Sequence, residues 1–319
     1  MKLQEGLTYD DVLLIPQHSF INHRSDVSTE SYLTRKIKLQ IPFVSANMDT
    51  VTESEMAIAM AREGGIGIIH RFMTVAEQVE QVNLVKRHVG FVVESPYTIT
   101  PDTKLAKVWA LLRKTGVNSF IVVDEKNHVV GMLGKRDYKF ESNRDKTVFE
   151  LMTPLKKLIL GKQKTSIKEA KQIFIKYKIE KLPLVDNNRV LIGLITARSI
   201  INFEKYPHST KDELGRYRVG AAIGVVNDFI ERAEALVNAK VDALVVDVAH
   251  GHNDVALQAV SQIRKKFKNI DIIGGNVATK AGVLDLIKRG VDAVKVGIGP
   301  GGLCTTRIVA GVGVPQFYI

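Results

Sequence analysis

One glycine-rich segment carries the residue types that covalent catalysis requires. It reads Val296-Gly-Ile-Gly-Pro-Gly-Gly-Leu-Cys-Thr-Thr-Arg307 and follows a short apolar run typical of a buried strand. A glycine loop after a strand lets backbone N–H groups approach a phosphate closely. Cys304 would stand at the start of the next helix, where the helix dipole stabilises a thiolate. A lone cysteine is more often inert packing, but this position favours a nucleophile, with Thr306 beside it as a hydrogen-bonding group.

The elements that must position this loop alternate between strands and helices. Strands are expected at 41–45, 65–69, 218–223, 243–247, 271–275 and 292–297, and helices at 53–63, 228–239, 253–267 and 280–289. Alternation with continuously apolar strands predicts a parallel sheet covered on both faces. Glycines at the strand ends predict the active-site rim of a barrel. The predicted fold is therefore α/β, a TIM (β/α)8-type barrel that is incomplete, with about six of its eight strands.

An internal repeat interrupts this pattern after the second strand. A helix at 105–117 and strands at 119–124 and 129–133 recur 62 residues later, at 167–179, 181–186 and 191–195. One common offset for three elements indicates a true repeat. Each unit is expected to end in a short glycine turn, at residues 131–137 and 193–199. The two units should bury their faces on each other. The predicted domains are residues 1–91, the insert 92–205, and the barrel continuation 206–319.

The net charge of +11 is concentrated in the insert. Residues 86–205 hold 24 Lys and Arg against 12 Asp and Glu, whereas the rest of the chain holds 21 against 22. Few aromatic residues interrupt the basic segment, so the stacking platforms of nucleic-acid binders are not apparent. We therefore expect no nucleic-acid partner. The excess charge indicates either a lysine-rich solvated surface or a site for small polyphosphates.

The composition is that of an ordinary globular protein, with 45% hydrophobic and 25% charged residues. No apolar run approaches the roughly 20 residues that span a bilayer, and the first residues lack the pattern of a signal peptide. A single cysteine excludes an internal disulfide. These features predict a cytoplasmic protein with no membrane partner.

Several motifs together resemble those of the IMP dehydrogenase/GMP reductase family. They are GLTYDDVLLIP (6–16), SANMDTVTE (45–53), EGGIGIIH (63–70), RVGAAIG (218–224), DVAHGH (247–252), GGNVAT (274–279) and GIGPGGLCTTRIVAGVGVPQ (297–316). They occur in the family's order and cover the whole chain. The repeat resembles the family's inserted tandem CBS-domain pair (cystathionine-β-synthase type), which GMP reductase usually lacks.

The resemblance implies an IMP dehydrogenase, which oxidises IMP to XMP with NAD⁺ in guanine nucleotide biosynthesis. Cys304 would attack C2 of the hypoxanthine ring, a hydride would pass to NAD⁺, and water would hydrolyse the thioimidate. The implied residue roles are as follows: catalytic, Cys304 and Thr306; NAD-binding, Asp247, Gly297, Ile298 and Gly299; substrate-binding, Met48, Asn276, Gly301 and Gly302; K⁺-binding through backbone carbonyls, Gly299, Gly301 and Cys304. The family also implies a homotetramer.

The chain departs from the family pattern at several of these positions. Gly302 stands where the family has a serine that contacts the substrate phosphate, and Val248 replaces a small hydroxyl residue beside Asp247. In the insert, Gly134 replaces a turn Ser or Thr, and Ser199 replaces a ribose-binding Asp. The family continues beyond the position of Ile319 into two more strands and a catalytic flap. We therefore expect this chain to be impaired or inactive by itself.

Three other interpretations stay open at this point. A GMP reductase shares the barrel motifs. A regulatory module would use only the CBS pair, with ATP or GTP bound there. A metal pair at His250 and His252 is weakly indicated, since two histidines two residues apart lack neighbouring carboxylates in the sequence.

Overall fold

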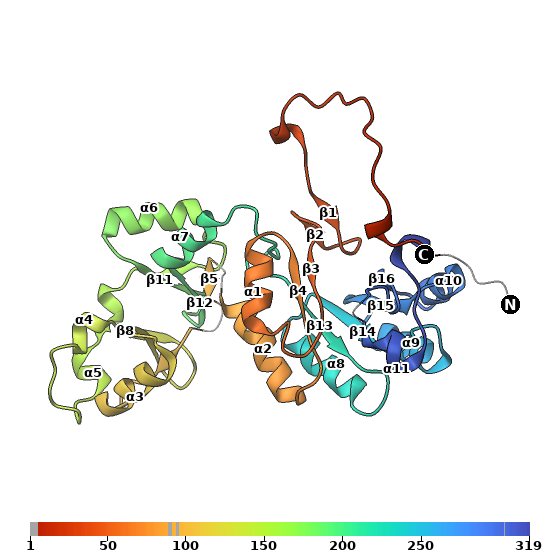
Figure 1. Cartoon of the computed structure of the whole chain (residues 1–319). Coiled ribbons are helices and arrows are strands. Elements are labelled where there is room, and N and C mark those ends of the chain that lie inside the picture. The colour runs from red at the N-terminus through yellow and green to blue at the C-terminus, as the bar shows by residue number, and fades with distance from the viewer. Residues whose placement is uncertain (1–5, 89–90, 94–95, 303) are drawn as a thin grey trace. The chain divides into compact units, whose positions relative to one another are not determined.

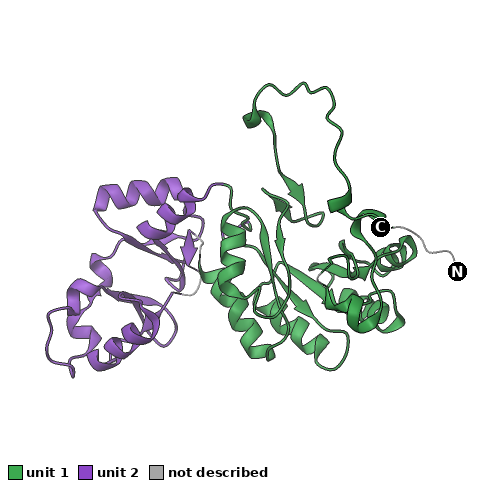
Figure 2. Ribbon diagram, in the orientation of Figure 1, with its two compact units in different colours: residues 1–88, 208–212, 216–319 green, residues 89–207, 213–215 purple. Residues whose placement is uncertain are grey.

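The chain divides into two compact units, which Figure 2 shows in different colours. The computed structural model describes residues 6–88, 91–93, 96–302 and 304–319. The larger unit comprises residues 1–88, 208–212 and 216–319, and the smaller unit comprises residues 89–207 and 213–215. The smaller unit is therefore an insertion into the sequence of the larger one.

The larger unit is built on one parallel sheet of six strands (Figure 1). They are β3 (Val44–Ser45), β4 (Ile66–Ile69), β13 (Val219–Ile223), β14 (Ala243–Asp247), β15 (Asp271–Val277) and β16 (Ala293–Val296). The sheet order is β16-β15-β14-β13-β4-β3, and every pairing is parallel. The predicted strands are confirmed, although the first is only two residues long. The fold is α/β with a curled parallel sheet of the TIM-barrel kind.

Helices alternate with these strands, as the sequence predicts. They are α1 (Ser54–Arg62), α2 (Val75–His88), α8 (Phe229–Asn238), α9 (Asp254–Lys266), α10 (Lys280–Lys288) and α11 (Thr305–Ala310). The side chains of Asn253 and Thr279 cap α9 and α10 by accepting backbone N–H groups of the first turn. Helix α9 buries Ala256, Val260 and Ile263, which face the sheet at the four- and three-residue spacing of one helix face. Helix α2 was missing from the predicted elements.

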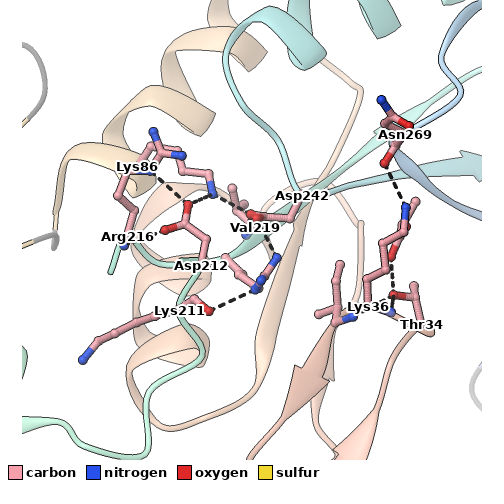
Figure 3. A network of polar contacts seen from close by, with 12 residues as sticks. Thr34, Lys36, Lys86, Lys211, Asp212, Arg216, Val219, Asp242 and Asn269 are labelled. Carbon is pink, nitrogen blue, oxygen red and sulfur yellow. Dashed lines mark hydrogen bonds and ion pairs between the residues drawn. The ribbon is translucent and has the colours of Figure 1, made fainter. Parts of the chain in front are cut away.

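A hairpin that the sequence analysis did not predict fills the inside of the curled sheet. Strands β1 (Ser31–Tyr32) and β2 (Lys38–Leu39) pair antiparallel. Ile37 and Leu39 are almost fully buried in one cluster with inward-facing residues of β4, β14 and β15. Thr34 donates to Asp271, the first residue of β15, and Lys36 Nζ lies 3.3 Å from the same carboxylate. The hairpin therefore reaches the amino ends of the strands, where Thr34 and Lys36 lie beside the start of β15 (Figure 3).

The smaller unit contains two four-stranded sheets, in the orders β6-β7-β8-β9 and β10-β11-β12-β5. The first half comprises β6 (Thr98–Ile99), α3 (Leu105–Thr115), β7 (Phe120–Val123), β8 (Val129–Leu133), α4 (Lys135–Tyr138), α5 (Val148–Leu151) and β9 (Thr153–Pro154). The second comprises β5 (Val92–Val93), β10 (Gly161–Lys162), α6 (Ile167–Tyr177), β11 (Lys181–Val185), β12 (Leu191–Thr196) and α7 (Ala197–Lys205). The predicted 62-residue repeat of helix, strand and strand is present. Ile121, Val123 and Val129 of one half pack with Leu191 and Leu194 of the other.

The glycine turns predicted at 131–137 and 193–199 begin too early, because the first glycine of each lies inside a strand. Gly131 lies inside β8 and Gly193 lies inside β12. A Cβ at Gly131 would come within 2.5 Å of Met152 Sδ and 2.9 Å of the Thr153 carbonyl oxygen, and one at Gly193 within 2.8 Å of Val92 Cγ1. The glycines are needed because β9 and β5 approach these strands closely, not because the chain turns.

A buried ion network lies where the larger unit is interrupted in sequence (Figure 3). Lys86, near the end of α2, is 7% exposed, and its Nζ lies 2.6 Å from Asp242 and 3.2 Å from Asp212. Arg216 Nε donates to Asp212 at 2.9 Å, and Arg218 Nη1 donates to Asp242 at 3.3 Å. Burial raises the pKa of Asp242. Burial also acts to raise the pKa of Asp212, but Lys86 and Arg216 outweigh it and lower the pKa.

Replacing Lys86 with Met should destabilise the larger unit strongly. The substitution leaves Asp212 and Asp242 buried without the ammonium group that they share, and breaking a buried ion pair typically costs about 3–5 kcal/mol. Urea unfolding followed by circular dichroism measures the change. The matched control is Lys38→Met, because the Lys38–Glu30 pair is exposed and such pairs contribute about 0–1 kcal/mol. Equal effects of the two substitutions would contradict a structural role for the network.

Candidate active site

The predicted site residues of the larger unit gather at the carboxyl ends of the parallel strands. Asp247 is the last residue of β14, and Asn276 is the last but one of β15. Met48 follows β3 by three residues and is 59% exposed. Gly297 comes directly after β16 and opens the loop 297–304. Because the carboxyl ends of parallel strands lie at one rim, the fold brings these segments to the same face of the sheet.

The loop 297–304 is held by one arginine. Arg307 Nε donates to the Gly299 carbonyl at 2.6 Å, and Nη2 donates to the Pro300 carbonyl at 2.8 Å. Gly299 has φ +55°, and a Cβ there would lie 2.9 Å from the Val312 carbonyl oxygen, so both backbone conformation and space require glycine. Gly301 and Gly302 are exposed, with open space around them. The loop is thus anchored at its start and open near Cys304.

The segment after α11 lies against this loop. Val314 N–H donates to the Ile298 carbonyl at 2.9 Å, and the Ile298 side chain is 8% exposed. A Cβ on Gly297 would lie 2.7 Å from Gln316 Oε1. Ile298 therefore contributes packing through its side chain, and any ligand at this position would meet backbone or the neighbouring glycines.

Cys304 stands directly before α11, as the sequence predicts. Its N–H donates to the Gly301 carbonyl at 3.1 Å, and its side chain is partly exposed. Hydrogen bonds from the Thr306 hydroxyl and backbone N–H lower the pKa of the thiol, and the charge of Arg307 acts in the same direction. A thiolate in such an environment is the reactive form of cysteine. Thr306 thus touches the thiol that the sequence predicts as nucleophile.

Charged residues that the sequence analysis missed surround Asp247. Lys295 Nζ lies 3.7 Å and Arg71 Nε 4.0 Å from the Asp247 carboxylate, which is 20% exposed. Lys295 Nζ also donates to Asn47 Oδ1 at 3.0 Å. Asn47 follows β3 and Lys295 lies on β16, so residues from the two edge strands meet above the sheet. Their positions at the ends of predicted strands were the sequence signal that could have identified them.

Three buried polar atoms at this rim have no hydrogen-bond partner within the described chain. They are Ser45 Oγ at the end of β3, Arg71 Nε after β4, and Asn276 Oδ1 at the end of β15. Buried polar groups are nearly always satisfied, so each unpaired one requires an explanation. A polar ligand at the rim would supply the missing partners.

Gln78 of α2 holds the carboxyl ends of β4 and β13 together. It is fully buried, and its Nε2 donates to the carbonyls of His70 at 3.0 Å and Ala222 at 2.8 Å, at the ends of β4 and β13. Arg232 Nη1 donates to Gln78 Oε1 at 2.9 Å. Gln78 was not predicted, because a single glutamine on a helix carries no sequence signal.

The histidines after β14 do not form a pair of metal ligands. His252 Nε2 lies 3.1 Å from Asp285 Oδ2, and the rings of His250 and His252 are 6.4 Å apart. In the part of the chain that the structure describes, no cluster of three His, Cys, Asp or Glu side chains is arranged to hold a metal ion.

Comparison with known proteins identifies the family. The model of the IMP dehydrogenase/GMP reductase domain matches residues 6–319. The chain belongs to the IMP dehydrogenase/GMP reductase family. It is 51% identical to inosine-5'-monophosphate dehydrogenase of Aquifex aeolicus and 48% identical to that of Nitrosopumilus maritimus, in each case over 99% of its own length. It spans 64% and 66% of those two relatives.

A solved structure extends the comparison to the fold. GMP reductase from Trypanosoma brucei in complex with guanosine 5'-triphosphate is 41% identical, with a TM-score of 0.91, and covers 98% of this chain and 76% of its own. The match includes the inserted unit. The expectation that the insert separates IMP dehydrogenase from GMP reductase therefore does not hold for this pair.

Among the described residues, no helix is long and apolar enough to span a bilayer.

Alkylation of Cys304 should report its lowered pKa. It is the single cysteine of the chain, so iodoacetamide labels one thiol. We expect the pH–rate profile to have its midpoint below that of free cysteine, and Thr306→Val to move the midpoint upward because a hydrogen bond to the thiolate is lost. Thr305→Val is the control, as Thr305 makes no contact with the thiol that lowers its pKa. Identical profiles for the parent and Thr306→Val would exclude this role.

Proposed function

We propose that this chain carries the nucleotide-oxidising site of an NAD-dependent IMP dehydrogenase that converts IMP to XMP. The observation that carries the proposal is Cys304, a thiol of lowered pKa next to an open glycine loop at the carboxyl rim of the sheet. The curated relatives named above bear the same activity in their names.

The reaction follows from the chemistry of the thiolate. The Cys304 sulfur forms a bond to C2 of the hypoxanthine ring, and the hydrogen at C2 leaves with its electron pair. NAD⁺ would supply the hydride acceptor, and Asp247, Gly297, Ile298 and Gly299 would hold it. Water then adds to C2 of the resulting thioimidate, the carbon–sulfur bond breaks, and the products are XMP and free Cys304, with release of a proton.

The carboxyl rim of the sheet offers groups that would bind NAD⁺ and IMP. Asp247 would hold the NAD ribose, because within the described residues its carboxylate oxygens accept no hydrogen bond and its two ion pairs are 3.7 Å and 4.0 Å long. Gly297, Ile298 and Gly299 would line the nicotinamide side. Asn276, whose Oδ1 is unpaired, would face IMP together with Met48, Gly301 and Gly302.

The proposed K⁺ site consists of three backbone carbonyls, those of Gly299, Gly301 and Cys304. Neutral carbonyl oxygens suit K⁺. Each of these three already accepts one N–H, from Arg307 or Cys304, and keeps a second lone pair. The donor set therefore fits K⁺, but the Arg307 guanidinium beside Gly299 places a positive charge next to it. We expect K⁺ to bind weakly here.

GMP reductase is the second candidate, and the structural match to the Trypanosoma brucei enzyme favours it. Under this alternative Cys304 would be the nucleophile as well, and the substrate and cofactor would be GMP and NADPH instead of IMP and NAD⁺.

The smaller unit is proposed to be a CBS pair that binds ATP or GTP. A cavity of about 380 Å³ is lined by 134–137 of the first half and 178–181 of the second, with four Lys or Arg among them. The Ser199 hydroxyl lies 2.9 Å from the Phe91 carbonyl and 2.8 Å from that of Thr196. It is therefore engaged with backbone instead of a ribose. Binding should be weak and salt-sensitive. A cytoplasmic location, expected from the composition, and a homotetramer, expected from the family, belong to the same proposal.

With IMP and NAD⁺, we expect at most a slow rise in absorbance at 340 nm, in line with the impaired activity expected from the sequence. Cys304→Ser should abolish any such rise, because the covalent bond to C2 cannot form. IMP should also slow alkylation of Cys304, which tests substrate binding independently of turnover. NADPH consumption with GMP, and no signal with IMP and NAD⁺, would instead assign GMP reductase. Unchanged alkylation with either nucleotide would contradict a nucleotide site at Cys304.

Gly302→Ser should tighten IMP binding. A Cβ at Gly302 meets nothing within 4 Å, so serine fits without strain. Its hydroxyl would donate to the substrate phosphate, and a hydrogen bond to a charged group is worth about 1.5–3 kcal/mol, or about tenfold or more in affinity. Calorimetry with IMP measures the gain, while inosine, which lacks the phosphate, should bind unchanged. Gly301→Ser, also in open space, is the positional control. Equal gains for IMP and inosine would refute a phosphate contact.

A further inference from the structure

A second cavity of the smaller unit is lined by residues of its second half alone. It measures about 590 Å³ and shares none of its lining residues with the cleft between the halves. One wall is a single face of α6, formed by Glu169, Gln172, Ile173, Lys176 and Tyr177 at three- and four-residue spacing. The other wall is β10 and the turn that follows it, residues 160–162 and 164–165. We name this cavity the α6 groove.

The α6 groove has an excess of positive charge. Lys162, Lys164 and Lys176 line it and are exposed, and none forms an ion pair with a carboxylate in the described chain. Its single carboxylate, Glu169, is already engaged, because Oε2 accepts the Ser166 N–H at 2.8 Å and the Ser166 hydroxyl at 3.0 Å. Those hydrogen bonds lower the pKa of Glu169. The lysines therefore have no local counter-charge, and an anionic ligand would supply it.

The internal repeat shows that the fold does not require this charge. At the positions 62 residues earlier, Thr100 stands in place of Lys162 and Asp102 in place of Lys164. The first half forms the same helix, strand and strand without those lysines. Lys162 and Lys164 are thus specific to the second half, whereas Lys176 has a counterpart in Lys114.

The groove also has an apolar part. Leu160 and Ile173 line it, and Tyr177 presents a ring that is 46% exposed, with Lys176 Nζ 5.2 Å from its centre. Aromatic and apolar surface next to cations is the combination that binds a base and its phosphates. A purely inorganic anion would not use Tyr177.

We propose that the α6 groove binds a nucleoside polyphosphate, with Lys162, Lys164 and Lys176 on the phosphates and Tyr177 against the base. This site is separate from the catalytic rim and from the cleft between the halves, so it does not depend on the function proposed for either. The ligand class is set by chemistry: three ammonium groups match the charge of a triphosphate, and the cavity is large enough for a nucleotide.

The test uses the full chain with ATP, GTP and inorganic tripolyphosphate as probes. The variant Lys162→Thr/Lys164→Asp introduces the residues of the first half, and we expect it to weaken ATP or GTP binding by about tenfold or more per lysine, since charge-assisted contacts are lost. Because these lysines are exposed and have no carboxylate partner, the melting temperature should stay unchanged. Arg136→Ala/Lys181→Ala in the cleft is the matched control, and should leave the groove affinity as it is.

Photolabelling with 8-azido-ATP locates the site. We expect labelled peptides from residues 160–177 in the parent chain and in the cleft variant, and loss of that label in the groove variant. Parent-like nucleotide binding by Lys162→Thr/Lys164→Asp would overturn the proposal. So would tripolyphosphate binding as tightly as ATP together with no effect of Tyr177→Ser, because the base would then make no contact.

Discussion

The rim of the larger unit depends on the curl of its sheet, and one contact shows that curl directly. β3 and β16 are the outermost strands in sheet order, yet Lys295 of β16 donates to Asn47, just after β3, at 3.0 Å. A flat six-stranded sheet would keep these residues far apart, since neighbouring strands are about 4.8 Å apart. On the inside, Ile37 and Leu39 of the hairpin fill the space that the curl encloses. Because of the curl, the carboxyl ends of all six strands surround one site instead of lying along a line.

The larger unit also tolerates a long insertion because its own residues are joined across the interruption. Lys86 precedes the insert, and Asp212 and Asp242 follow it, yet the three share one buried network. A buried ammonium between two carboxylates has few alternative arrangements, since any separation leaves a charge unpaired in the interior. The network therefore defines how the interrupted chain resumes. Nearer the rim, Gln78 also joins segments that precede and follow the insert, because it donates to the carbonyl groups at the ends of β4 and β13.

The proposed reactive centre follows the pattern expected from the family, whereas several of the proposed ligand contacts depart from it. Cys304 and Thr306 are present in the geometry that lowers the pKa of the thiol. Gly302 removes a hydroxyl from the phosphate side, and the hydroxyl of Ser199 is engaged with backbone carbonyls. The basic α6 groove lies on a different surface from the cleft. Under the proposed function, nucleotide recognition in this chain would depart from the family pattern more than its chemistry would.

The sequence by itself determined the features that depend on local pattern. Apolar runs separated by helical stretches predicted the six strands, and the glycine loop predicted that Cys304 precedes a helix. Both signals are local, because the spacing of apolar residues and the freedom of the backbone depend on neighbouring residues. Only the tertiary structure decided what depends on residues distant in sequence. The hairpin that fills the sheet, the partners of Lys295 and Lys86, and the close strand approach at Gly131 and Gly193 all join segments that no local pattern connects. A glycine in a turn and a glycine in a strand next to a closely paired strand have the same sequence signature. Only the position of the neighbouring strand distinguishes them.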